Sequence, residues 1–286
     1  MRTIRSVKKM AALSSRFRKE GKSIAFVPTM GYFHEGHLGL MRFGRTACDV
    51  LVVSIFVNPL QFGPGEDYER YPRDMKRDAR LAGGAGADML FCPSADEMYP
   101  AGFQTHVEVE AVTQPLCGGK RPGHFQGVTT VVAKLFNIVR PHRAIFGLKD
   151  YQQWLTVRRM AAELNMDGEV IGRPTTREPD GLAMSSRNIY LAPEERKTAL
   201  VVYQSLCLAQ DLVSKGERDA GRIGKAVGNL LSSQERIDLD YVTICHPDTL
   251  SERAVIDGKT LLAVAVHIGK TRLIDNCFLF SENNDV

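Results

Sequence analysis

The chain has 286 residues, 44% hydrophobic and 24% charged, which excludes disordered, collagen-like and disulfide-scaffold proteins. It is long enough for one large domain or two of moderate size. Its 37 lysines and arginines exceed its 33 aspartates and glutamates by only four charges, with no run of like charge. This balance suits an anionic small-molecule substrate better than a nucleic-acid track, so no nucleic-acid partner is expected.

The six cysteines are widely spaced and form no C-x-x-C pair, which argues against a zinc ribbon, a redox pair or a disulfide framework. We expect buried thiols in a reducing cytoplasm. No apolar run reaches the ~18 residues of a membrane span, so no membrane association is expected. The basic first twenty residues resemble a transit peptide, but they lead into a strand without a cleavage-like spacer. We therefore expect an amphipathic first helix.

Strands and helices are predicted to alternate along the first part of the chain. Residues 23–29 form a short apolar strand, and 50–57 (VLVVSIFV) is apolar throughout, as is typical of a central parallel strand. Further strands are expected at 87–92, 144–146 and 170–172, and helices at 37–47, 74–81 (with a stop at 83–86), 127–139 and 151–164. This alternation predicts a doubly wound, Rossmann-like parallel α/β sheet.

The pattern changes after about Thr176. Two helices are expected near 193–215 and 217–232, followed by antiparallel strands at 240–245, 261–267 and 271–280 with a hairpin turn at Gly269–Lys270. We therefore predict a first domain over 1–175 and a smaller α+β domain over 176–286.

The strongest local signal is PTMGYFHEGH, from Pro28 to His37, between the first sheet strand and the next helix. Ligands bind at such strand ends in α/β sheets, and the helix start offers free N–H groups and a positive dipole end for a phosphate. His34 and His37 are three apart and share a face of the first turn. Two imidazoles there could donate hydrogen bonds to phosphate oxygens whose charge grows in a transition state.

Other roles for this motif have weaker support. A zinc site of the H-E-x-x-H type needs histidines four apart, so we expect no protein-held metal here. Purely structural histidines in a tight turn stay an open alternative. The motif lacks the G-x-G-x-x-G pattern, which weakens a dehydrogenase interpretation.

The H-x-G-H element resembles the signature of the nucleotidyltransferase superfamily that includes class I aminoacyl-tRNA synthetases. Those proteins pair it with a later loop of the KMSKS type, and Met184-Ser185-Ser186-Arg187 stands at that place here. Its hydroxyls and guanidinium could hold the polyphosphate of ATP, although an isolated Ser-Ser-Arg turn is more often a solvated loop.

A closer resemblance covers nearly the whole chain. PTMGYFHEGH, NPLQFGPGEDYERYPRD, RPGHFQGVTTVV, FGLKDYQQ, DGLAMSSRN and GKTRLIDN occur in the order seen in the pantoate–β-alanine ligase (pantothenate synthetase) family. The resemblance implies ATP-dependent condensation of (R)-pantoate with β-alanine through a pantoyl-adenylate, releasing pyrophosphate and AMP. It also implies a cytoplasmic homodimer and the use of Mg²⁺ with ATP.

The resemblance implies roles for particular residues. His37 is the proton donor, with His34 and Lys149 as further catalytic residues, and Gln61 and Gln153 hold pantoate. Arg121 and His124 lie near the second substrate or the phosphates. The ATP site comprises Met30, Gly31, Tyr32, Phe33, His34, Glu35, Gly36, His37, Gly147, Leu148, Lys149, Asp150, Thr176, Met184, Ser185, Ser186 and Arg187.

Elementary chemistry agrees with these roles. Two glutamines offer donors and acceptors to a hydroxy acid, whereas an acidic residue would repel it, and Lys149 places a positive charge where adenylyl transfer develops negative charge. Taken alone, each of these side chains is more often an exposed polar residue. Asp78 is a weaker candidate for Mg²⁺, because acids on helix surfaces are common.

The sequence departs from the usual family pattern at several places, namely Tyr32, Phe33, Gly39, Gln126, Leu148 and Thr176. Two other functions stay open: a nucleotidyltransferase that stops after moving AMP, and a non-catalytic RNA- or nucleotide-binding protein. The second predicts a basic stripe that this sequence lacks.

Overall fold

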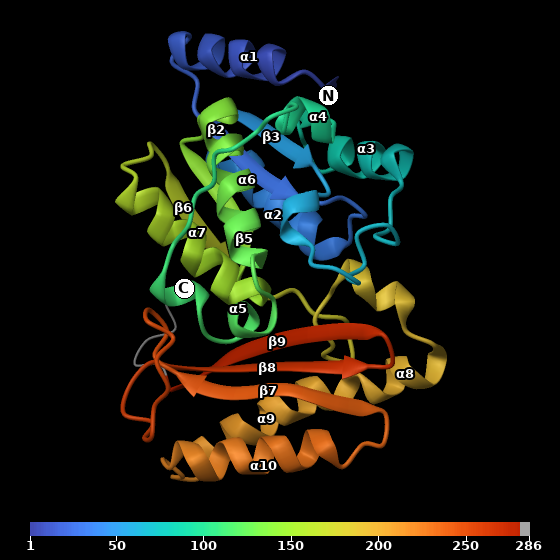
Figure 1. The fold of residues 1–286 in the computed structure, drawn as a ribbon, viewed down its shortest axis with the longest axis vertical. Coiled ribbons are helices and arrows are strands. Elements are labelled where there is room, and N and C mark those ends of the chain that lie inside the picture. Colours follow the sequence, from blue (N-terminus) through green and yellow to red (C-terminus); the bar gives the residue numbers. More distant parts are fainter. Residues whose placement is uncertain (281–286) are drawn as a thin grey trace. The chain divides into compact units, whose positions relative to one another are not determined.

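The computed structural model describes residues 1–280, which divide into two compact units (Figure 1). The first comprises residues 1–113, 117–148 and 152–174. The second takes two short segments, 114–116 and 149–151, together with the chain from Thr175 onward. Lys149 and Asp150 therefore belong to the second unit.

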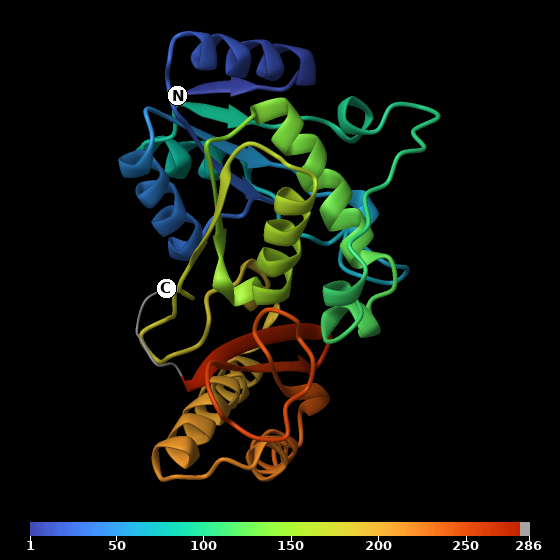
Figure 2. The same cartoon turned by 90° about the vertical axis from the view of Figure 1, so that its left-hand side faces the viewer.

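The first unit is built on a parallel sheet of six strands. In spatial order these are β1 (Arg2–Ile4), β4 (Met89–Phe91), β3 (Val50–Ile55), β2 (Ile24–Thr29), β5 (Arg143–Gly147) and β6 (Glu169–Arg173). The predicted doubly wound parallel sheet is confirmed. Strand β1 was not expected, because three residues are too few to show a pattern; Figure 2 shows it beside β4.

Helices flank this sheet. They are α1 (Val7–Lys19), α2 (Glu35–Ala47), α3 (Met75–Gly84), α4 (Ala95–Met98), α5 (Cys117–Lys120), α6 (His124–Val139) and α7 (Tyr151–Glu163). The predicted stop at residues 83–86 is wrong by two residues, because α3 includes Gly83 and Gly84. Glycine costs a helix only about 1 kcal/mol, and the buried Ala82 anchors this last turn.

Side-chain alternation along the strands assigns the helices to opposite faces. Ala25 and Val27 of β2 pack in one core with Met41 of α2. Phe26, between them in sequence, points to the other face and meets Phe136 of α6 with ring centroids 6.4 Å apart. Both faces of β2 are thus covered, which explains why the strand has no polar side.

The second unit combines three helices with an antiparallel sheet. Its elements are α8 (Pro193–Thr198), α9 (Leu200–Ser214), α10 (Ala220–Ser232), β7 (Ile237–Cys245), β8 (Thr260–Ile268) and β9 (Thr271–Phe280), with strand order β7-β8-β9. Leu206 of α9 and Val227 of α10 share a core with Val264 of β8. The single helix expected over 193–215 is two, since α8 ends at Thr198 and α9 begins at Leu200. Between them, the carbonyl of the fully buried Ala199 accepts the N–H of Val202 at 3.2 Å, three residues on. Within residues 1–280, no helix combines the length and apolarity needed to cross a membrane.

Candidate active site

The turn after β2 is tied to its neighbours by side chains. The Thr29 hydroxyl donates to the carbonyl of Ser54 on β3 at 2.6 Å and accepts the N–H of Gly31 at 3.1 Å. Gly31 has φ of 88°, and a Cβ there would lie 2.9 Å from Ile55 Cγ2. Both the left-handed backbone and the close approach require glycine at this position.

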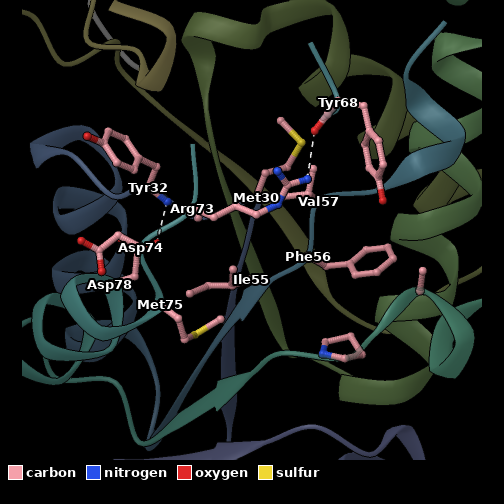
Figure 3. A pocket seen from close by; sticks show the side chains of 13 residues that line it. Met30, Tyr32, Ile55, Phe56, Val57, Tyr68, Arg73, Asp74, Met75 and Asp78 are labelled. Atoms are coloured by element: carbon pink, nitrogen blue, oxygen red, sulfur yellow. Dashed lines mark hydrogen bonds between the residues drawn. The ribbon is translucent and has the colours of Figure 1, made fainter. Parts of the chain in front are cut away.

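Asp78 on α3 fixes the next two residues of the turn. One carboxylate oxygen accepts the backbone N–H of Tyr32 at 2.6 Å (Figure 3). The other accepts the backbone N–H of Phe33 at 2.8 Å. Tyr32 has φ of 51°, an unfavourable value for a residue with a side chain. Asp78 is 1% exposed, so it is not the surface acid that its helix suggested. Burial raises the pKa of Asp78, although the two N–H groups and the Arg77 guanidinium oppose that shift.

The two histidines meet at the start of α2. His34 precedes the first helical residue, and the Nδ1 of His37 accepts its backbone N–H at 3.3 Å. Their ring centroids are 4.0 Å apart, and the fully buried Phe33 ring lies 5.5 Å from that of His37. Because Nδ1 of His37 is an acceptor, the neutral ring carries its proton on Nε2. His37 thus presents a donor on the ring edge opposite the helix cap.

Gln61 ends the 3-10 helix Pro59–Gln61 and is held through its backbone. His124 Nδ1 donates to the Gln61 carbonyl at 2.8 Å, and Arg121 Nη2 donates to it at 3.3 Å. The Gln61 side-chain Nε2 lies 3.3 Å from the sulfur of Met30, 31 positions earlier in sequence. The Gln61 side chain therefore lies at the turn between β2 and α2, the segment that leads into the two histidines.

The consecutive glutamines of α7 differ in role. The Gln152 side chain accepts the Cys117 N–H and donates to the Val112 carbonyl, both at 3.0 Å, so it supports the backbone. Gln153 is partly exposed in the same unit. The side chain of Gln152 is occupied by backbone groups, whereas that of Gln153 is partly exposed. Gln153 as the pantoate ligand stays a prediction.

The loop after Gln61 is held by an ion pair. Glu66 binds Arg121 through two contacts, Nε–Oε1 at 2.7 Å and Nη2–Oε2 at 2.6 Å. Arg121 Nη1 also contacts His124 Nε2 at 3.0 Å. Burial opposes ionisation of Glu66, but the hydrogen bonds and charge of Arg121 outweigh it and lower the pKa of that carboxyl. The loop is thereby joined to the same two residues that hold Gln61.

A pocket of about 220 Å³ opens beside the turn, at the carboxyl ends of β3 and β4 (Figure 3). Met30, Tyr32 and Asp78 line one side. On another side, the Arg73 guanidinium donates to the carbonyls of Tyr68 and Tyr71, both at 2.9 Å. The turn therefore borders a space large enough for a small ligand.

In the second unit, two residues of β9 bind the segments that contain Met184 and Lys149. Met184 N–H donates to the Thr176 carbonyl at 3.0 Å, closing a short hairpin. Asp275 of β9 holds that hairpin by binding the Arg177 guanidinium with both oxygens, at 2.6 and 3.1 Å. The adjacent Asn276 donates to the Lys149 carbonyl at 2.9 Å. One strand thus fixes both the Met184 segment and Lys149.

The remaining predicted residues lie at the ends of helices and strands or next to them. Glu35 and Gly36 open α2, Gly147 ends β5, Leu148 is buried, and Ser185 accepts the Arg187 N–H at 3.2 Å. Sequence reasoning did not assign roles to Asn58, Glu66, Asp275 or Asn276. Each lies in a motif block, but its partner is distant in sequence or is a backbone group, so residue type alone gave no signal.

We predict that Asp78→Asn loosens the turn. An amide has only one acceptor oxygen, so one of the Tyr32 and Phe33 N–H groups loses its partner, at a cost of about 1–3 kcal/mol. Exchange of that amide proton should accelerate roughly tenfold or more, measured by hydrogen exchange with NMR detection. Asp219→Asn, which changes the cap of α10 in the second unit, is the control. Unchanged protection of both amides would show that Asp78 does not hold the turn.

A second prediction concerns pH. Because the pKa of Glu66 is lowered in the folded protein, its pairing stabilises the fold above its ordinary pKa of about 4.5, and this is lost as pH falls through the lower folded value. The unfolding free energy of the wild type should exceed that of Glu66→Gln at pH 7. The difference should shrink as the pH falls below about 4.5, measured by urea titration. Glu69→Gln, in the same loop but exposed, should show no such pH-dependent difference.

The chain is similar to known proteins over nearly its whole length. Residues 2–278 match the family model described as pantoate-beta-alanine ligase. The chain is 58% identical to a pantothenate synthetase of Geobacter sulfurreducens, covering 99% of this chain and 100% of that protein. It is 57% identical to one from Thermotoga neapolitana, covering 98% and 100%.

Two solved structures are similar over nearly their whole length. A pantothenate synthetase from Thermus thermophilus gives a TM-score of 0.93 at 47% identity, covering 98% of this chain and 100% of that one. A pantoate-beta-alanine ligase from Francisella tularensis, complexed with beta-gamma ATP and beta-alanine, gives 0.79 at 30% identity, covering 98% of each chain.

Proposed function

This chain belongs to the pantoate–β-alanine ligase family, and we propose which of its residues carry each step of the reaction. It condenses (R)-pantoate with β-alanine using ATP, through a pantoyl-adenylate, releasing pyrophosphate and AMP. The observation that carries this conclusion is the match over residues 2–278, within which lies the turn that stacks His34 on His37. The enzyme is an AMP-forming carbon–nitrogen ligase.

The order of steps follows from the chemistry of the acid. A carboxylate is a poor acyl donor because its oxygen is a poor leaving group. Transfer of AMP from ATP to pantoate gives a mixed anhydride and releases pyrophosphate. The amine of β-alanine then attacks the acyl carbon, and AMP leaves.

The histidines serve the first of these steps. Neutral His37 carries its proton on Nε2, so it can donate to a phosphate oxygen as negative charge develops there. His34 adds a second imidazole 4.0 Å away, and the start of α2 adds backbone N–H groups. The His37 Nε2–H and the backbone N–H groups are donors, which matches an anionic transition state.

The two glutamines serve pantoate. Gln61 lies against Met30 at the turn, and its amide can donate to an oxygen of the substrate. Gln153 supplies a second amide from α7. Neither carries a negative charge, so neither repels the pantoate carboxylate.

The remaining predicted residues are assigned to ATP. From the first unit these are residues 30–37, Gly147 and Leu148; from the second, Lys149, Asp150, Thr176 and Met184–Arg187. Lys149 acts as a positive charge toward the phosphates. Mg²⁺ enters bound to ATP. When bound with ATP, the ion would be held largely through phosphate oxygens and would neutralise part of the triphosphate charge.

Location and assembly are proposed on separate grounds. The six cysteines are free, which supports a reducing compartment such as the cytoplasm. A homodimer is proposed on the family resemblance alone.

We predict that His37→Gln separates structure from catalysis. Glutamine is a usual residue at this capping position, so it can still accept the His34 N–H. The melting temperature should change little, while pantoate-dependent adenylate formation falls ~10²–10³-fold because the imidazole donor is lost.

His34→Ala should also lower that rate, with a larger effect on the KM for ATP. His246→Ala, in the second unit, is the control. Near-normal turnover in both motif variants would make the histidines structural and the site assignment wrong.

The adenylate mechanism makes a further prediction. With MgATP and pantoate alone, the enzyme should exchange labelled pyrophosphate into ATP and hold about one acid-labile pantoyl-adenylate per site. Adding β-alanine should discharge it to pantothenate and AMP. Isolation of a phosphorylated pantoate with ADP, or the absence of pantoate-dependent exchange, would contradict the mechanism.

A further inference from the structure

A chain of side-chain hydrogen bonds leads from Gln61 to Tyr99. The Tyr99 hydroxyl donates to Asn58 Oδ1 at 2.8 Å, and Asn58 Nδ2 donates to Gln61 Oε1 at 3.2 Å. Asn58 is 1% exposed and Gln61 is 9% exposed. The three side chains therefore form a relay that starts at the partly exposed Tyr99, 41 residues beyond Asn58 in the sequence, and is buried at Asn58 and Gln61.

Backbone groups determine the orientation of the Asn58 amide. Its Oδ1 accepts the N–H of Leu60 at 3.3 Å, and its Nδ2 donates to the carbonyl of Gly127 at 3.0 Å. A backbone N–H can only donate and a carbonyl can only accept, so a flipped amide would lose both bonds. The Tyr99 hydroxyl strengthens the same orientation by donating to Oδ1.

This orientation sets the polarity of Gln61. Because Asn58 Nδ2 is a donor, it must face the Gln61 oxygen, and the Gln61 amide nitrogen must face the other way, toward Met30. Gln61 therefore presents N–H donors at the turn. Gly127 allows this close packing, since a Cβ there would lie 2.2 Å from the Leu60 carbonyl oxygen.

Tyr99 is itself firmly placed. Its ring packs edge-on against Phe103 with centroids 5.0 Å apart and lies 6.1 Å from the Phe56 ring. The Lys134 ammonium is 5.7 Å from the same ring. Burial raises the pKa of Tyr99, so its hydroxyl stays protonated and remains a donor at neutral pH.

We propose that Tyr99 is a positioning residue that fixes, through Asn58, which end of the Gln61 amide meets pantoate. The site then offers an N–H donor to an oxygen that accepts a hydrogen bond, such as a carboxylate oxygen. The opposite orientation would set the Gln61 oxygen against that carboxylate. The inference rests on the proposed function, because it takes pantoate as the partner of Gln61.

The test is a double-mutant cycle on pantoate binding. Tyr99→Phe removes one hydrogen bond from the relay, and the KM and Kd for pantoate should rise about fivefold, with kcat at saturating pantoate unchanged within about twofold. Gln61→Ala should weaken binding more. In the Gln61→Ala background, Tyr99→Phe should have no further effect, because the amide that it orients is gone. Pyrophosphate exchange and calorimetry supply the measurements.

Two further variants complete the test. Asn58→Asp still accepts from Tyr99 and Leu60 but cannot donate to Gln61, so it should weaken pantoate binding at least as much as Tyr99→Phe. Ser205→Ala removes a buried hydroxyl that donates to the Val202 carbonyl in the second unit and is the control for general loss of stability.

The outcomes separate two kinds of failure. If Gln61→Ala binds pantoate normally, Gln61 is not a pantoate ligand, and the proposed site fails together with this inference. If Gln61→Ala weakens binding but Tyr99→Phe does not, or weakens it equally in both backgrounds, only the positioning role of Tyr99 is overturned. Normal binding by Asn58→Asp would overturn it in the same way.

Discussion

The pair of hydrogen bonds from Tyr32 and Phe33 to Asp78 is the contact on which the active-site turn depends. The turn passes through two successive left-handed residues, and the second is a tyrosine, for which that conformation is unfavourable. A buried carboxylate that accepts both N–H groups offsets this cost and is itself stabilised by them. Because α2 begins directly afterwards, the directions of both histidines follow from this contact.

Backbone groups set the polarity of several side chains at the site. The His34 N–H makes His37 Nδ1 an acceptor, and the Gln61 carbonyl makes His124 Nδ1 a donor. Asn58 is oriented by one N–H and one carbonyl in the same way. A backbone N–H always donates and a backbone carbonyl always accepts. The orientation of each of these side chains is therefore set before any ligand binds. Under the proposed assignment, N–H donors at the site would meet a carboxylate and a polyphosphate, and preorganised donors need no rearrangement as charge develops.

The sequence predicted the parts of the fold that depend on local patterns. Strands β2 and β3 are apolar on both faces, and the turn between β2 and α2 has a recognisable composition, so both were found with their neighbours. Strand β1 is too short to show a pattern, and the break between α8 and α9 at Ala199 carries no glycine or proline that would mark it in the sequence. The family blocks proposed His34, His37, Gln61 and Gln153 as site residues, but they could not show how those residues are held.

The supporting contacts were beyond the reach of sequence because they join distant positions. Asp78 meets the turn 46 residues away, and α3 gives no sign that this one acid faces inward. Tyr99 and Asn58 differ by 41 positions, and the polarity of their relay depends on the backbone of Leu60 and Gly127. Residue types indicate which chemistry is available at a site. Three-dimensional packing decides which end of each polar group faces the ligand.

The unusual residues of the turn show how such packing absorbs sequence change. Phe33 stands where the family usually has a smaller residue, yet its ring is fully buried beside His37. The larger Tyr32 ring lies 5.1 Å from the Arg77 guanidinium, which is also 3.6 Å from the Asp78 carboxylate. Arg77 therefore connects the added ring to the same carboxylate that fixes the turn. Both side chains add ring contacts beside the turn, and the Tyr32 and Phe33 N–H groups keep their bonds to Asp78.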